Sequence, residues 1–94
     1  MLGRIRVGGH SMEPALHHGD ELLFVRMSPR IGSVVVARDP RDDDRLVIKR
    51  VAAIEGDDVT LASDRPDHET LRVDRRALIG RAILRYRPGL VRLR

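Results

Sequence analysis

Two stretches of this sequence carry residue types that can perform acyl-transfer chemistry. The first is Gly8-Gly9-His10-Ser11-Met12-Glu13-Pro14, in which a serine follows two glycines. Paired glycines let the backbone take positive φ and approach another chain closely, which is how a protein presents a hydroxyl and its amide to a substrate carbonyl. A glycine-rich connection between strands, with a serine that only caps a turn, has the same pattern. This stretch alone leaves both interpretations open.

The second stretch is Leu46-Val47-Ile48-Lys49-Arg50-Val51, an apolar strand candidate that holds the chain's single lysine among 18 basic side chains. Arginine stays protonated under ordinary conditions, whereas a desolvated lysine can lose its proton and act as a base. Such a base needs its pKa to fall from ~10.4 towards roughly 7–8. A compositional bias towards arginine is the alternative explanation. Taken with the serine motif, Lys49 is interpreted as a general base that activates Ser11, with Arg50 on the opposite face of the strand.

The order and spacing of several short motifs resemble those of the type I signal peptidases. These motifs are Ser11-Met12-Glu13-Pro14, Gly19-Asp20, Gly32-Ser33-Val34-Val35-Val36, Lys49-Arg50-Val51 and Gly56-Asp57. The LexA-type self-cleaving repressors share the same Ser-Lys core. The resemblance covers roughly residues 3–88, and the short form of the family that this chain resembles most is the nickel-type superoxide dismutase maturation protease. Residues 78–88 look like the closing strand of that form.

The resemblance implies roles for several residues. Ser11 is expected to be the nucleophile and Lys49 the base. In some members a hydroxyl residue two positions before the nucleophile is a second oxyanion donor; here that position is Gly9. Ser63 is the expected orienting hydroxyl, although Ser63-Asp64-Arg65-Pro66 matches only the start of the family's longer Ser-x-Asp-Ser-Arg segment. The expected substrate-binding and oxyanion residues are Gly9, His10, Met12 and Ser63.

Three histidines near the serine invite other interpretations. His17 and His18 are adjacent, so their side chains point in different directions on most backbones, and no carboxylate or cysteine completes a recognisable metal-ligand spacing. We therefore expect no metal and no cofactor. His10 is a possible base for Ser11, but neighbours in sequence rarely reach each other with good geometry. Lys49 is the better candidate.

The composition bounds the class of protein. A length of 94 residues fits a single domain, residues 1–94, and the absence of cysteine excludes a disulfide framework and a thiol nucleophile. The net charge of +4 permits an acidic partner, but Phe24 and Tyr86 are the only aromatics available for stacking, so we expect no nucleic acid as partner. No apolar run approaches the ~18 residues of a membrane span and no secretory signal is present, so a soluble, cytoplasmic protein is expected.

Short strands separated by turn residues predict a mainly β, coiled-sheet or barrel-like domain with one or two short helical turns. The expected helical turns cover residues 11–16 and 75–78, the second capped by Asp74. Polar loops are expected at residues 39–45 and 63–72. The expected strands are residues 5–7, 21–26, 33–38, 46–55, 59–62 and 79–86.

The function predicted from these observations is that of a serine endopeptidase with a Ser-Lys dyad. It would remove an N-terminal leader or propeptide from a protein substrate, and the resemblance points to nickel-type superoxide dismutase as that substrate. The alternative is a catalytically weak, peptidase-like module whose basic surface holds an acidic partner. Self-cleavage is disfavoured because no Ala-Gly or Cys-Gly site precedes Ser11. The sequence does not determine the oligomeric state.

Overall fold

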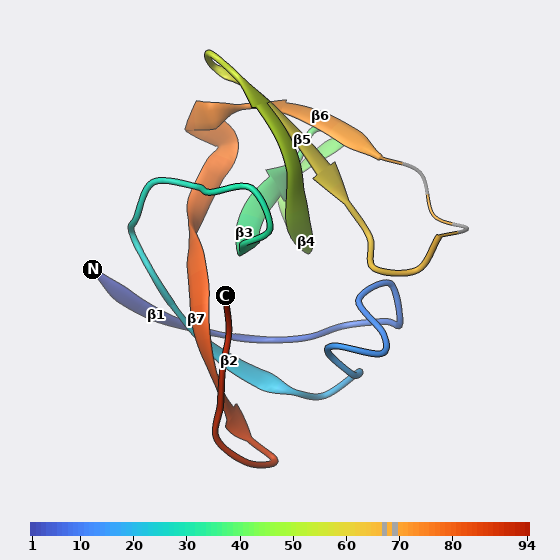
Figure 1. Ribbon diagram of the computed structural model, residues 1–94, viewed down its shortest axis with the longest axis vertical. Coiled ribbons are helices and arrows are strands. Elements are labelled where there is room, and N and C mark those ends of the chain that lie inside the picture. The colour runs from blue at the N-terminus through green and yellow to red at the C-terminus, as the bar shows by residue number, and fades with distance from the viewer. Residues whose placement is uncertain (67, 69) are drawn as a thin grey trace.

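The structure, a computed structural model, describes residues 1–66, 68 and 70–94 (Figure 1). Within them an antiparallel sheet has the strand order β1-β2-β7-β3-β4-β5-β6, and β8 pairs with β7. A 3₁₀ turn, η1 (Arg75–Ala77), lies between β6 and β7. The strands are β1 (Leu2–Arg6), β2 (Glu21–Val25), β3 (Val34–Asp39), β4 (Asp42–Glu55), β5 (Asp58–Ala62), β6 (Leu71–Asp74), β7 (Leu78–Arg87) and β8 (Val91–Arg92).

Strand β3 is buried on both faces and separates two hydrophobic cores. Because side chains alternate along a strand, Val34 and Val36 face one core while Val35 and Ala37 face the other. The run of four consecutive apolar residues therefore reflects a strand covered on both sides. The first core comprises Val7, Met12, Leu16, Leu22, Phe24, Val34, Val36 and Ala82. The second core comprises Val35, Ala37, Val47, Val51, Val59, Leu61, Leu71 and Val73.

The longest strand, β4, connects the elements of the candidate site. It pairs with β3 at Val35↔Lys49 and with β5 at Arg50↔Ala62. Continuing this antiparallel register by one residue places Lys49 opposite Ser63, the residue that follows β5. The strand pairing thus brings Ser63 beside Lys49 without any help from the loop that follows.

Strands β1, β2 and β7 approach closely around Phe24. A Cβ added at Gly3 would lie 2.3 Å from the Phe24 ring, and one at Gly80 would lie 2.7 Å from the carbonyl oxygen of Val25 and 2.8 Å from the same ring. All three separations are shorter than a van der Waals contact of a carbon atom allows. The glycines therefore make room for the aromatic ring in the first core.

Most expectations from the sequence are confirmed. The chain is mainly β, and Asp74 caps η1 by accepting a hydrogen bond from Arg76 N at 2.8 Å. Residues 11–16 instead form hydrogen-bonded turns, with a single i→i+4 bond from Leu16 N to Met12 O at 2.9 Å. A single bond of this kind closes one turn and is not followed by a second, so no helix develops there.

Two expected loops are wrong in part. The first was expected over residues 39–45, but β4 begins at Asp42, so the acidic residues 42–44 belong to a strand and the turn lies at residues 40–41. The second was expected over residues 63–72, but β6 begins at Leu71 and pairs with β5. Residues 67 and 69 of that loop lie outside the described residues.

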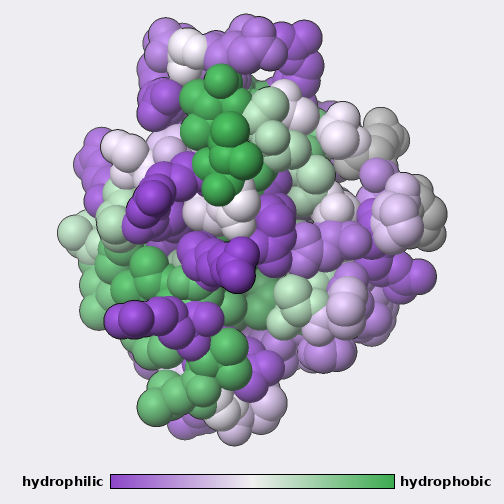
Figure 2. All heavy atoms as spheres, viewed as in Figure 1, coloured by the Kyte–Doolittle hydropathy of each residue, from purple (hydrophilic) through white to green (hydrophobic). Residues whose placement is uncertain are grey.

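The surface drawn in Figure 2 is largely hydrophilic, with apolar groups between the charged ones. Large apolar side chains are exposed on several segments rather than on one strand. They are Met1, Leu2, Met27, Ile31, Leu46, Leu90 and Val91.

The close approach at Gly80 gives a stability prediction. Gly80→Ala should lower the free energy of unfolding by about 1–3 kcal/mol, because the added methyl meets a backbone oxygen that cannot rotate away. Gly8→Ala is the matched control: its Cβ would meet no described atom within 4 Å, so a change within about 0.5 kcal/mol is expected. Urea unfolding of both variants measures the difference, and equal losses would contradict the packing argument.

Candidate active site

Ser11 lies in a loop between β1 and β2 that we call the nucleophile loop, residues 7–20. Two backbone hydrogen bonds close its base: Val7 N donates to Asp20 O, and Gly19 N donates to Val7 O, each at 2.8 Å. Met12 and Leu16 are each 1% exposed and pack into the first core. The loop is thus anchored at its base and from beneath, which leaves Ser11 at its surface.

Gly9 has the positive φ, 83°, that the paired glycines led us to expect, whereas Gly8 does not. The Gly9 N–H donates to His18 Nδ1 at 2.9 Å. That amide is therefore already bonded and does not serve as a free oxyanion donor. By contrast, no acceptor for the Ser11 N–H is found among the described residues.

The Lys49 amine lies between two hydroxyl groups. Its Nζ is 3.0 Å from Ser11 Oγ and 2.8 Å from Ser63 Oγ. These distances are within the range of ordinary hydrogen bonds. Ser11 comes from the nucleophile loop, Lys49 from β4, and Ser63 from the position directly after β5. Ser11 lies 38 residues and Ser63 14 residues from Lys49 in sequence, and both side chains meet its Nζ.

The surroundings of Lys49 favour the neutral amine. Partial burial lowers the pKa of Lys49, and the positive charges of Arg41 and Arg45 lower it further. Asp39 acts in the opposite direction and raises it, although Arg41 pairs with that carboxylate at 3.0 Å. Lys49 has intermediate exposure, so its side chain is removed from water only in part.

Residues 63–65 form a clamp across the site. The Ser63 hydroxyl meets Lys49, the Asp64 carboxylate pairs with Arg50, and Arg65 N donates to Ser11 O at 3.1 Å. Figure 1 shows the nucleophile loop (blue) beside the segment that follows β5 (yellow). Three consecutive residues thus connect Ser11 to the strand that carries Lys49.

The ion pair in this clamp is bidentate. Arg50 Nε and Nη2 donate to the two Asp64 oxygens at 2.8 and 2.9 Å, and Nη1 donates to Gly32 O at 2.8 Å. The hydrogen bond to Asp64 raises the pKa of Arg50. Arg50 therefore faces away from the lysine amine, as expected from strand alternation, and secures the loop after β5 to the β2–β3 connection.

Residues 1–87 match the family described as signal peptidase, peptidase S26. The chain belongs to this family. It is 39% identical over 70 residues to the mitochondrial ATP-independent inner membrane protease subunit 1a of Arabidopsis thaliana, a segment that is 68% of this chain and 42% of that protein. It is 33% identical over 61 residues to signal peptidase I of Streptococcus pneumoniae serotype 4, covering 65% of this chain and 30% of that protein. The chain spans less than half the length of these relatives.

In this signal peptidase family member a groove of about 430 Å³ leads to Ser11 and Lys49. Its apolar lining comes from Ile5, Val7 and Met12 and from residues 46–48 of β4. Arg6 and Arg45 also line it and supply positive charge. The groove lies between β1 and β4, where an extended peptide could reach the serine.

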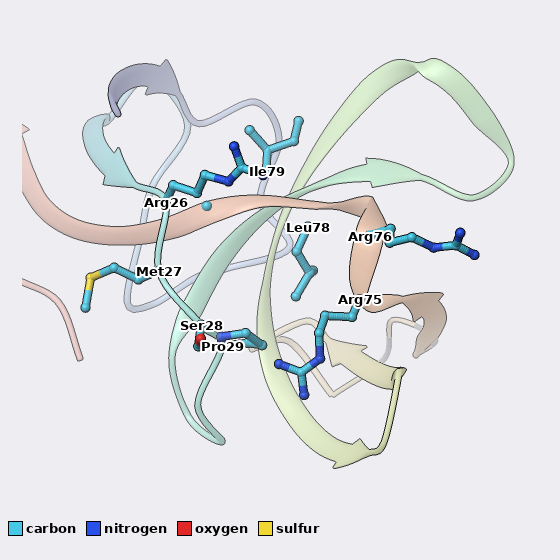
Figure 3. Close-up of a pocket in the computed structure, with 9 residues that line it drawn as sticks. Arg26, Met27, Ser28, Pro29, Arg75, Arg76, Leu78 and Ile79 are labelled. Carbon is cyan, nitrogen blue, oxygen red and sulfur yellow. The ribbon is translucent and has the colours of Figure 1, made fainter.

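Other hollows lie away from this chemistry. One of about 540 Å³ is lined by residues 26–29 and by the segment from Arg75 to Gly80 (Figure 3). Neither Ser11 nor Lys49 lines it. The site of this signal peptidase relative is thus identified by its side chains and not by the size of its cavities.

The remaining predicted site residues do not meet at the lysine amine. His10 Nδ1 bonds to Glu13 Oε2 at 2.6 Å, an interaction that lowers the pKa of Glu13. The Met12 side chain is a buried core residue that also lines the groove. Residue types alone did not identify the Arg50–Asp64 pair, although an acidic residue directly after Ser63 and a basic one directly after Lys49 were the available signal.

Two further structural observations concern the described part of the chain. No group of three or more His, Cys, Asp or Glu residues there is arranged to hold a metal ion. No helix there has the length and apolar character needed to cross a membrane.

The clamp gives the second prediction. Asp64→Asn should lower the free energy of unfolding by about 1–3 kcal/mol, because it leaves the half-buried Arg50 without its carboxylate. Asp58→Asn is the matched control. Asp58 pairs with Arg72 at 3.6 Å with both side chains well exposed, and such pairs contribute roughly 0–1 kcal/mol. Urea unfolding of both variants tests this, and a smaller loss for Asp64→Asn than for Asp58→Asn would contradict it.

Proposed function

We propose that this protein is a serine endopeptidase in which Ser11 is the nucleophile and Lys49 the general base. The observation that carries the proposal is the 3.0 Å separation of Ser11 Oγ from a lysine amine whose pKa is lowered by burial. Membership of the signal peptidase family supports the serine peptidase class and the removal of leader sequences from proteins.

The first half of the reaction transfers the substrate's acyl group to the enzyme. Neutral Lys49 Nζ takes the proton of the Ser11 hydroxyl as Oγ attacks the scissile carbonyl carbon. The carbonyl oxygen becomes an oxyanion, to which the unbonded N–H of Ser11 can donate. The lysine ammonium then gives its proton to the leaving amine as the C–N bond breaks. An acyl-enzyme ester on Ser11 and a released peptide amine result.

The second half regenerates the serine. Lys49, neutral again, takes a proton from a water molecule that attacks the ester carbonyl. Collapse of that intermediate breaks the bond to Ser11 Oγ, which recovers its proton from Lys49. The same amine serves as base and acid in both halves.

Ser63 orients the base in this mechanism. A neutral amine has two N–H bonds and one lone pair, so donation to Ser63 Oγ at 2.8 Å leaves the lone pair available to the Ser11 hydroxyl. The Ser63 hydroxyl is itself fixed by the clamp. It acts as a positioning group and transfers no proton of its own.

We infer that the substrate is a protein with an N-terminal leader or propeptide, bound as an extended segment in the groove beside Ser11. The apolar lining suits small or aliphatic side chains, and Arg6 and Arg45 favour acidic groups nearby. Nickel-type superoxide dismutase is the specific substrate proposed. That choice is supported by the resemblance of this short chain to the maturation proteases of that enzyme.

A second candidate function is a binding module for an acidic partner. It is favoured by a hollow of about 520 Å³ whose lining includes Arg30, Arg50, Arg81 and Arg94 and no acidic residue. In that case Ser11→Ala would leave partner binding unchanged and no cleavage would be seen in the wild type. The peptidase experiment below therefore distinguishes the two.

The third prediction tests the nucleophile and the base. Ser11→Ala and Lys49→Arg should each lower the cleavage rate of a leader-bearing precursor by at least ~10²-fold, because arginine keeps the charge but cannot accept a proton. Both variants should bind the precursor with near wild-type affinity. Cleavage followed by mass spectrometry gives the rate and the cut site. Full activity in Lys49→Arg would assign the base to another group, with His10 next to be tested.

The fourth prediction concerns pH. Because Lys49 must be neutral to act, kcat/KM should rise with pH through the lowered pKa of Lys49 and level off below the ~10.4 of a free lysine. Since a bound peptide covers the half-exposed amine, the inflection in kcat should lie at a lower pH than that in kcat/KM. A stopped assay from pH 6 to 11 measures both. A rate that falls over this range as pH rises would contradict the assignment.

A further inference from the structure

Gly9 lies two residues before the nucleophile and is not held by packing. A Cβ added there would meet no described atom within 4 Å, and its φ of +83° is one that glycine leaves readily. The bonds that close the base of the nucleophile loop are made by Val7, Gly19 and Asp20 and do not involve Gly9. The hydrogen bond from Gly9 N to His18 Nδ1, at 2.9 Å, is thus the contact that fixes this backbone.

The direction of this bond defines the form of the histidine. A backbone N–H only donates, so Nδ1 must carry its lone pair and no proton. In the neutral ring the proton then lies on Nε2. Protonation of Nδ1 would turn the acceptor into a donor that faces another donor, and the bond would break.

We propose that His18, as the neutral ring protonated at Nε2, is a positioning residue that holds the Gly9 amide and thereby fixes the backbone leading into Ser11. This inference rests on the proposed function in so far as Ser11 is the nucleophile.

Charged and titratable groups surround His18 on both sides. The His10 ring lies 5.8 Å from it, centroid to centroid. Arg85 lies 3.9 Å from the Asp20 carboxylate, which also accepts a bond from His17 N. The groups that face this region are His10, Glu13, Asp20, Arg85 and Arg87.

Three variants test the proposal through the cleavage assay. His18→Ala should lower kcat roughly two- to tenfold, the effect expected of one ordinary hydrogen bond, and leave KM unchanged because the substrate groove is intact. His18→Asn should restore most of the activity, since its Oδ1 can accept the Gly9 N–H and cannot be protonated near neutral pH. His17→Asn is the matched control: its side chain is exposed and its backbone N–H still reaches Asp20.

A purely structural role for His18 predicts a different pattern. His18→Asn would then lose as much activity as His18→Ala, or His17→Asn would match them both, and either result would overturn the proposal. Thermal unfolding of each variant accompanies the kinetics. If His18→Ala does not fold, His18→Leu, which fills the space of the ring but offers no acceptor, takes its place; the same two- to tenfold loss of kcat is expected, and wild-type kcat would overturn the proposal.

Nuclear magnetic resonance tests the bond without any substrate. Imidazole ¹⁵N shifts of the wild type should show His18 protonated at Nε2, and the Gly9 amide should exchange slowly and lose that protection in His18→Ala. A proton on Nδ1 at pH 8, or an unprotected Gly9 amide, would overturn the inference whatever the activity. If instead both signatures are present but no leader-bearing substrate is cleaved, the proposed peptidase function fails while the His18–Gly9 contact stands.

Discussion

The structure depends on holding one lysine amine beside two hydroxyl groups while removing part of its hydration. Lys49 Nζ meets Ser11 and Ser63 at hydrogen-bond distances, and each of the three residues comes from a different segment. An ordinary lysine amine is strongly hydrated and charged, so a site that uses it as a base must replace its water with neutral partners. Both partners here are hydroxyls, which satisfy the amine without stabilising its charge as a carboxylate would.

Few of the charges around the amine oppose the lowering of its pKa. The basic side chains that act on Lys49 are Arg41 and Arg45, and both lower its pKa. The nearest acidic influence, Asp39, is paired with Arg41. Asp64 directly follows Ser63, and it is turned away to bind Arg50 on the other face of β4. Strand alternation thus separates the ion pair that stabilises the clamp from the amine that loses its charge in the proposed mechanism.

The sequence allowed prediction of the parts whose signal lies in residue type. A lone lysine in an apolar strand and a serine after paired glycines identified the two groups that meet, and the Val-rich run at residues 33–38 predicted the strand β3. The bond from Arg65 N to Ser11 O could not be predicted, because every residue but proline has a backbone amide. Strand β6 was missed although its apolar Leu71 and Val73 alternate with polar residues, because two apolar positions at the end of a polar stretch are a short signal. The role of the His18 ring was hidden for a similar reason, since its partner is the backbone of Gly9.

Partial burial of Lys49 also has a consequence for the order of events in the proposed mechanism. A fully buried lysine would be neutral over a wider range of pH, but it would leave no route for a substrate carbonyl to reach Ser11. The open groove leaves the amine half exposed in the free protein, so burial lowers its pKa only in part. An extended peptide lying over Ile48 and Met12 would exclude the remaining water and complete that desolvation. Binding of the substrate would then increase the fraction of neutral Lys49 as the scissile carbonyl reaches Ser11, because the surface that binds the peptide also covers the amine.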